Sequence, residues 1–119
     1  MNVSDRDRLR HMLDAALRSG KAALAFVEGR TQDDLRASRL LVSALARQIE
    51  IVGEAAARTS ADCKIAIPGI PWPVVLGMRN RLIHAYFDVD LEIVWTTVTV
   101  DFPDMVRVLE GVLVERGEK

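Results

Sequence analysis

The pattern of hydrophobic and polar positions follows a helical period over most of the chain. Within residues 5–28, apolar side chains recur at spacings of three and four, the period of one face of an α-helix. These side chains are Leu9, Met12, Leu13, Ala16, Leu17, Ala23, Leu24 and Val27. The pattern predicts an amphipathic helix over residues 5–28 that stops at Gly29. Gly20 lies inside this helix, where glycine costs about 1 kcal/mol relative to alanine.

A second and longer helix is predicted to begin at Thr31 or Asp33 and to run to about Arg58. One broad side of it is apolar and the opposite side is polar. The apolar side comprises Leu41, Val42, Ala44, Leu45, Ile49, Ile51, Val52, Ala55 and Ala56, and the polar side Arg36, Arg39, Ser43, Arg47, Glu50, Glu54 and Arg58. The polar side is either a solvated face with local pairs such as Glu54 with Arg58, or a support for an arginine on a neighbouring helix through Glu50 or Glu54.

The second half of the chain predicts two further helices. Pro71 or Pro73 can occupy the first turn of a third helix, where a missing amide donor does no harm. Residues 93–100 have a strand-like composition, but no second strand candidate exists to pair with them. Because the apolar positions of residues 91–112 keep a helical spacing, we predict a final helix with a kink at Pro103. The expected fold is all-α: one domain spanning residues 1–119, an antiparallel bundle of four or five helices.

Charge and composition narrow the class of protein. The net charge of −1 gives no general attraction to nucleic acid or anionic lipid, so RNA binding would require a local patch. No apolar run approaches the ~20 residues of a membrane span, and no signal core follows the charged N-terminus. The single cysteine, Cys63, excludes an internal disulfide and a multi-cysteine metal site. We expect a soluble cytoplasmic protein without membrane contact.

The candidate chemistry is concentrated in residues 79–86, Arg-Asn-Arg-Leu-Ile-His-Ala-Tyr. Arg79 can grip a phosphate through its fork of donors, and His84 can move a proton near neutral pH. On an unbroken helix Arg79 falls within the apolar arc, whereas Asn80, Arg81 and His84 lie on the polar side. Arg79 and His84 are then about 140° apart. They converge only if the helix frays before His84 or if two copies of the chain meet, which favours a composite site in a homodimer.

Structural explanations compete with these roles. Arg79 can form a buried salt bridge with Glu50 or Glu54 in place of binding a ligand. His84 can complement the dipole at the end of a helix. No second histidine lies at ligand spacing from it, so we expect neither a metal nor a cofactor.

The pattern Arg79-(four residues)-His84-x-Tyr86 with its flanks resembles the HepT-like toxins of the HEPN superfamily. The flanks that carry the resemblance are Ile70-Pro71-Trp72 and residues 87–95, and residues 48–56 resemble the second helix of that family. Together these matches cover most of the chain. Ala85 stands where the family pattern leads us to expect glycine, and its methyl group restricts the backbone beside Tyr86.

The resemblance implies a helical homodimer whose motif helices face each other. It implies the toxin of a type II toxin–antitoxin pair: a metal-independent endoribonuclease that cuts tRNA or mRNA, with Arg79 and His84 as the nuclease site. The implied partner is an MntA-like nucleotidyltransferase antitoxin that silences the toxin by attaching AMP to Tyr86. Asn80 and Arg81, next to His84 on the polar side, can add substrate contacts.

Two alternative functions stay open. The first is a non-catalytic helical module that binds a nucleotide or holds a partner nucleotidyltransferase, which a net charge of −1 would suit better than RNA binding. The second is a purely structural bundle in which Arg79 serves only as a salt-bridge partner.

Overall fold

In the computed structural model, residues 3–59, 61, 64, 69–70, 72–73, 76–77 and 91–115 are described. Every regular element in these ranges is a helix, which confirms the predicted all-α class. The elements are α1 (Val3–Val27), α2 (Gln32–Ala37), α3 (Arg39–Arg58), α6 (Leu91–Thr96), the π-helix η1 (Thr97–Asp101) and α7 (Phe102–Glu115). The helical spacing of residues 91–112 therefore predicts the structure correctly where the strand-like composition does not.

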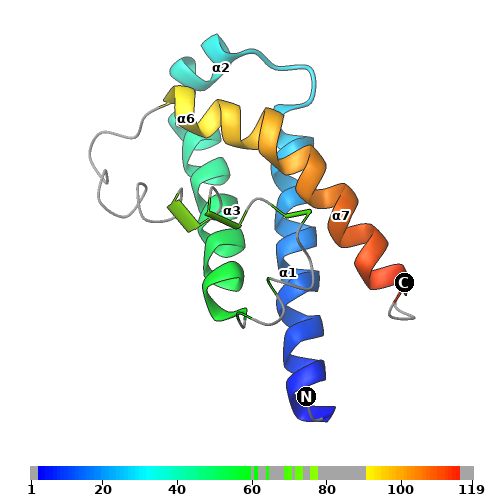
Figure 1. The fold of residues 1–119 in the computed structure, drawn as a ribbon. Coiled ribbons are helices and arrows are strands. Elements are labelled where there is room, and N and C mark those ends of the chain that lie inside the picture. The colour runs from blue at the N-terminus through cyan, green and yellow to red at the C-terminus, as the bar shows by residue number, and fades with distance from the viewer. Residues whose placement is uncertain are drawn as a thin grey trace.

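Helix α1 is the centre of the arrangement. It runs up through the molecule in Figure 1, and α3 and α7 descend on either side of it, so both lie antiparallel to α1 and in contact with it. The short helix α2 crosses the top and contacts α3 and α6. The predicted antiparallel bundle is confirmed by this arrangement.

The first helix ends where its sequence predicts. Gly29 has a φ of 73°, the left-handed conformation that glycine adopts at low cost, and it is the one residue with positive φ in the described part of the chain. The Arg30 amide then donates to the carbonyl oxygen of Val27 at 2.9 Å. This turn sends the chain away from α1 and toward α2.

The prediction of one continuous helix from Thr31 or Asp33 to Arg58 is wrong, because the chain breaks at Ser38. The first start is confirmed: Thr31 caps α2 in a reciprocal capping box with Asp34. Ser38 has extended dihedral angles, φ −135° and ψ 102°, and its hydroxyl accepts a hydrogen bond from the Leu41 amide at 3.1 Å. A serine hydroxyl can replace a helical backbone bond in this way, so Ser38 ends α2 and begins α3.

The final helix contains a π-helical turn just before the proline that is predicted to kink it. The Phe102 amide donates to the carbonyl oxygen of Thr97, five residues earlier. The hydroxyls of Thr97 and Thr99 donate to carbonyl oxygens one turn back, at 2.8 and 2.7 Å. Pro103 follows with no amide hydrogen to offer. Figure 1 shows the chain changing direction between α6 and α7, so η1 accommodates the irregularity over several residues.

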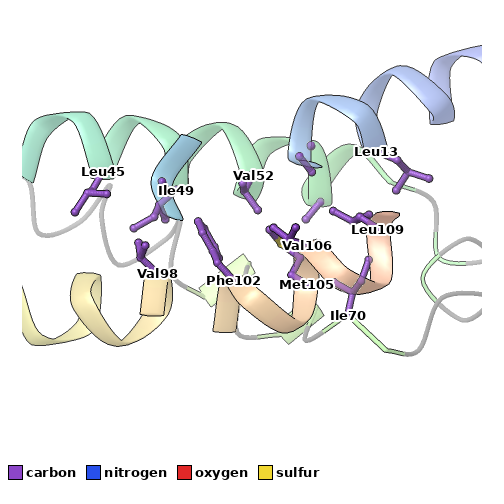
Figure 2. Packing of buried hydrophobic residues seen from close by; sticks show 14 of the residues in the cluster. Leu13, Leu45, Ile49, Val52, Ile70, Val98, Phe102, Met105, Val106 and Leu109 are labelled. Carbon is purple, nitrogen blue, oxygen red and sulfur yellow. The ribbon is translucent and has the colours of Figure 1, made fainter. Parts of the chain in front are cut away.

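The core joins α1, α3 and the C-terminal helical segment. Figure 2 shows Val98 and Phe102 facing Ile49 and Val52 of α3. Leu45, Val94 and Val98 have no exposed surface, and Phe102 is 1 % exposed. Ile70, from the connection between α3 and α6, also enters this core, with 4 % of its surface exposed. Ile70, nine residues before Arg79 in the sequence, is therefore held in the core.

Gly20 allows α1 and α7 to approach closely. A Cβ atom built there would lie 2.9 Å from Met105 Cε and 2.9 Å from Val106 Cγ2. We expect Gly20→Ala to lower the free energy of unfolding by about 1 kcal/mol, because overpacking of 1–3 kcal/mol exceeds the gain of about 1 kcal/mol in helix propensity. The matched variant Gly111→Ala in α7, where a Cβ meets nothing within 4 Å, should gain stability. Denaturant unfolding of both variants tests the contact, and equal gains would contradict it.

Candidate functional site

The residues predicted for catalysis, substrate contact and modification lie outside the described part of the chain: Arg79, Asn80, Arg81, His84 and Tyr86, together with Ala85. The possible pairing of Arg79 with Glu50 or Glu54 lies outside it for the same reason. The described features considered for a site are the end of α3, residues 69–70, 72–73 and 76–77 before the motif in the sequence, and the surface between α1 and α3.

The polar side of α3 forms local ion pairs. Arg47 Nη1 lies 3.6 Å from Glu50 Oε2, and Arg58 Nη2 lies 2.9 Å from Glu54 Oε1. All four side chains are largely solvent-exposed, so each pair adds a few tenths of a kcal/mol. The predicted pair of Glu54 with Arg58 is confirmed.

The end of α3 contacts the segment that precedes the motif. The hydroxyl of Thr59 donates to the carbonyl oxygen of Ala55 at 2.8 Å, and Lys64 Nζ donates to the carbonyl oxygen of Thr59 at 3.0 Å. The same ammonium lies 5.8 Å from the ring centroid of Trp72, within cation–π range. Lys64 therefore links the C-terminus of α3 to Trp72, where its charge also complements the helix dipole.

Trp72 and Leu76, which come shortly before the motif in the sequence, pack against the bundle. The Trp72 amide donates to the carbonyl oxygen of Ile70 at 2.8 Å. Both Trp72 and Leu76 are partly buried and pack on the core cluster. They are four residues apart, the spacing of neighbours on one helix face, and Arg79 follows Leu76 by three residues. The candidate catalytic residues are thus a short stretch of chain away from a fixed position on the core.

An open groove lies between α1 and α3, with a volume of about 520 Å³. Each helix lines it with residues at relative positions 0, 3, 4 and 7, one edge of a helix face. From α1 these are Arg8, His11, Met12 and Ala15, and from α3 Ile51, Glu54, Ala55 and Arg58. The lining combines apolar residues with charged ones. His11 is exposed, and its position in the groove depends on the pairing of two helices, which the sequence of one helix cannot predict.

Asp101, in the π-helix, has a raised pKa. Partial burial, and secondarily repulsion from Asp104, raises the pKa of this carboxyl above its ordinary value of 3.8. The folded state then binds a proton more readily than the unfolded state. Stability contributed by the neutral carboxyl is present at low pH and is lost as the pH rises through the folded pKa.

We therefore expect Asp101→Asn to raise the Tm at pH 7, with a difference that shrinks as the pH falls below the folded pKa. Asp33→Asn is a suitable control, because Asp33 is exposed and pairs with Arg36 at 3.1 Å. That substitution should leave the Tm unchanged or lower it slightly. Thermal melts at several pH values measure both effects. A stabilisation by Asp101→Asn that grows toward low pH would show the sign to be wrong.

The described part of the chain contains neither a membrane-spanning helix nor a cluster of metal ligands. Within them, no helix has the length and apolar character needed to cross a bilayer. Among the same residues, no three histidine, cysteine, aspartate or glutamate side chains gather closely enough to hold a metal ion.

The chain matches a known protein family over most of its length. Residues 16–112 match the family described as "Ribonuclease HepT-like". The "Probable ribonuclease HepT" of Thermococcus cleftensis is 45% identical over 62 residues, 52% of this chain and 56% of that protein, so the chain spans just over half the length of this relative. A "Putative RNase" of Caldanaerobacter subterraneus is 29% identical over 87% of this chain and 93% of its own length. A "Putative RNase" of Methanocaldococcus jannaschii is 30% identical over 91% and 98%. No solved structure matches the chain.

Proposed function

This chain belongs to the HepT-like ribonuclease family, and from that premise we propose that it is a metal-independent endoribonuclease, the toxin of a type II toxin–antitoxin pair. The observation that carries the proposal is the family match over residues 16–112, which includes the whole of residues 79–86. The names of its relatives, which describe ribonucleases, support RNA as the substrate, with tRNA or mRNA as the candidates. Arg79 and His84 are the proposed catalytic residues.

The proposed reaction uses the chemistry of RNA itself. The 2′-hydroxyl loses its proton and attacks the adjacent phosphorus, and the bond from phosphorus to the 5′-oxygen breaks as that oxygen takes up a proton. His84 serves this reaction as a proton acceptor or donor, because a histidine side chain ordinarily exchanges protons near neutral pH. Arg79 stabilises the negative charge that develops on the phosphate oxygens. The products are a 2′,3′-cyclic phosphate and a 5′-hydroxyl, and Asn80 and Arg81 contribute contacts that orient the substrate.

The site is proposed to be composite, with Arg79 from one subunit and His84 from the other. The support is their five-residue separation, which on a regular helix directs the two side chains about 140° apart. In a homodimer, a two-fold axis brings the same segment of both chains together and generates two equivalent sites.

Mixing two inactive variants tests this arrangement. A dimer of one Arg79→Ala chain and one His84→Ala chain retains one intact site if the residues come from different subunits, and none if they come from the same subunit. With random exchange of subunits we expect about a quarter of the wild-type cleavage rate to return. Size-exclusion chromatography checks that mixed dimers form. Mixed dimers without cleavage activity would contradict the composite site.

Tyr86 is the proposed point of control by an MntA-like nucleotidyltransferase antitoxin. Transfer of an AMP group to its hydroxyl would add bulk and negative charge beside the arginine that binds phosphate. Intact-mass measurement after incubation with ATP and such an enzyme should show the addition of one adenylyl group. The same treatment of Tyr86→Phe should leave the mass unchanged, and modification of that variant would place the AMP elsewhere.

A non-catalytic module remains the second candidate, because the net charge of −1 is unusual for a protein that binds RNA. In that role Arg79 and His84 would bind a nucleotide or hold the partner nucleotidyltransferase. The two candidates differ in whether an unmodified chain cuts RNA.

A further inference from the structure

We propose that the groove between α1 and α3 binds single-stranded RNA, with Arg8 and Arg58 contacting its phosphates. This inference rests on the proposed ribonuclease function and extends it to residues outside the predicted motif. A chain with a net charge of −1 needs a local group of positive side chains to attract a polyanion, and the two arginines of the groove would provide one.

The charges of the groove are arranged for an anion. Because α1 and α3 are antiparallel, Arg8 near the start of α1 and Arg58 at the end of α3 lie at the same end of the groove. Arg8 and His11 form no ion pair with any residue in the described part of the chain. Arg58 pairs with Glu54 but is 67% exposed, and a guanidinium has five donors. Among the described lining residues two arginines accompany one glutamate, so this part of the lining carries a net positive charge.

Part of the groove lining is apolar and suits the non-ionic parts of a nucleotide. Met12, Ala15, Ile51 and Ala55 are the apolar residues that line it. Ribose and the face of a base can pack on such residues while the phosphates contact the end of the groove that carries the two arginines. The volume of about 520 Å³ falls within the range of about 300–1,000 Å³ that is typical of small-molecule sites.

The groove adjoins described residues that come shortly before the motif in the sequence. Met12 and Ala55 line both the groove and a small apolar cavity whose other walls include Ile70 and Trp72. Arg79 follows Trp72 by seven residues in the sequence, and seven residues span at most about 25 Å.

RNA binding in a His84→Ala background tests the inference without cleavage of the probe. Fluorescence anisotropy with a labelled single-stranded RNA oligonucleotide measures the Kd across a series of KCl concentrations. Arg8→Ala with Arg58→Ala should weaken binding about tenfold and reduce the slope of log K against log salt by about 1.4, since each phosphate contact to a single strand contributes about 0.7. Arg18→Ala with Arg36→Ala is the matched control, because it also removes two exposed arginines, which pair with Asp14 and Asp33 and do not line the groove. It should bind as the parent does.

A second pair of variants tests the groove without removing an arginine. Ala15→Glu places a negative charge in the groove and should weaken binding. Ala25→Glu should not weaken it, because Ala25 is an exposed residue of the same helix that does not line the groove. Circular dichroism checks the fold of all variants. Unchanged affinity and salt slope in the groove variants would overturn the inference. This holds equally if the groove binds nothing and if it binds a protein partner.

Cleavage assays separate this inference from the proposed function. If the chain with His84 intact cuts RNA and the groove variants bind RNA normally, the inference falls and the ribonuclease function stands. If the groove variants lose RNA binding but the intact chain cuts nothing, the groove stands as an RNA site and the ribonuclease function falls.

Discussion

Replacing His84 by alanine is expected to slow RNA cleavage by about 10²- to 10⁴-fold, the contribution that a positioned general acid or base makes. Methyl in place of imidazole leaves no group of suitable pKa to move the proton of the 2′-hydroxyl. Arg79→Ala should cost about 10²- to 10³-fold, because the developing phosphate charge loses its cation. Single-turnover cleavage of an end-labelled RNA by each variant measures these losses.

Arg107→Ala provides the control for these two substitutions. Arg107 is an exposed residue of α7 that pairs with Asp104 at 2.8 Å, so its removal changes the charge by the same amount as Arg79→Ala. It should cleave RNA at the wild-type rate. If a folded His84→Ala variant kept more than about a tenth of the wild-type rate, a proton-transfer role for His84 would be untenable.

Replacing Phe102 by alanine is expected to cost about 3–5 kcal/mol of stability, the usual loss for a large aromatic residue removed from a core. Phe102 is 1% exposed and packs where α7 meets α3, as Figure 2 shows. A loss of this size is a large part of the roughly 5–15 kcal/mol that stabilises a typical domain. Denaturant or thermal unfolding would therefore show a much less stable or partly unfolded protein.

Leu40→Ala is the appropriate comparison, because Leu40 is also a large apolar residue of the bundle but is 82% exposed. It should change the stability by no more than about 0.5 kcal/mol. A similar loss in both variants would contradict the packing of Figure 2.

The helices of this fold were predictable where one face of a segment determines its structure. The apolar positions from Leu9 to Val27 predict α1, and Gly29 predicts its end, because both signals are local. The break at Ser38 was missed because one hydroxyl–amide bond, to Leu41, decides it within an otherwise continuous pattern. The π-helix was missed because its backbone hydrogen bond over five residues, from the Phe102 amide to the carbonyl oxygen of Thr97, leaves no mark in the spacing of the apolar positions.

Features that depend on two distant segments could not be predicted from the pattern alone. Gly20 is unfavourable for α1 considered by itself, and only the close approach of Met105 and Val106 explains its place there. The groove is a similar case. Arg8 and Arg58 each follow a regular spacing on their own helix, but the pairing of α1 with α3 is needed to bring them together.

The candidate catalytic residues were predicted by a different kind of signal. The spacing of Arg79, His84 and Tyr86, with the flanking sequence, resembles a known family, and the match over residues 16–112 confirms that membership. Helical periodicity alone allowed a buried salt bridge for Arg79 as an alternative to a catalytic role. Its roles and those of His84 and Tyr86 are therefore predictions from sequence, which the experiments above are designed to test.

The central claim, that this chain cuts RNA without a metal, is tested most directly by incubating the purified protein with tRNA and total RNA in excess EDTA. Intact-mass measurement first confirms that Tyr86 carries no AMP, and a His84→Ala preparation serves as the control for contaminating nucleases. We expect the wild-type protein to release fragments with 2′,3′-cyclic phosphate ends and the variant to release none. Intact RNA after incubation with the unmodified wild-type protein would contradict the claim and favour the non-catalytic module.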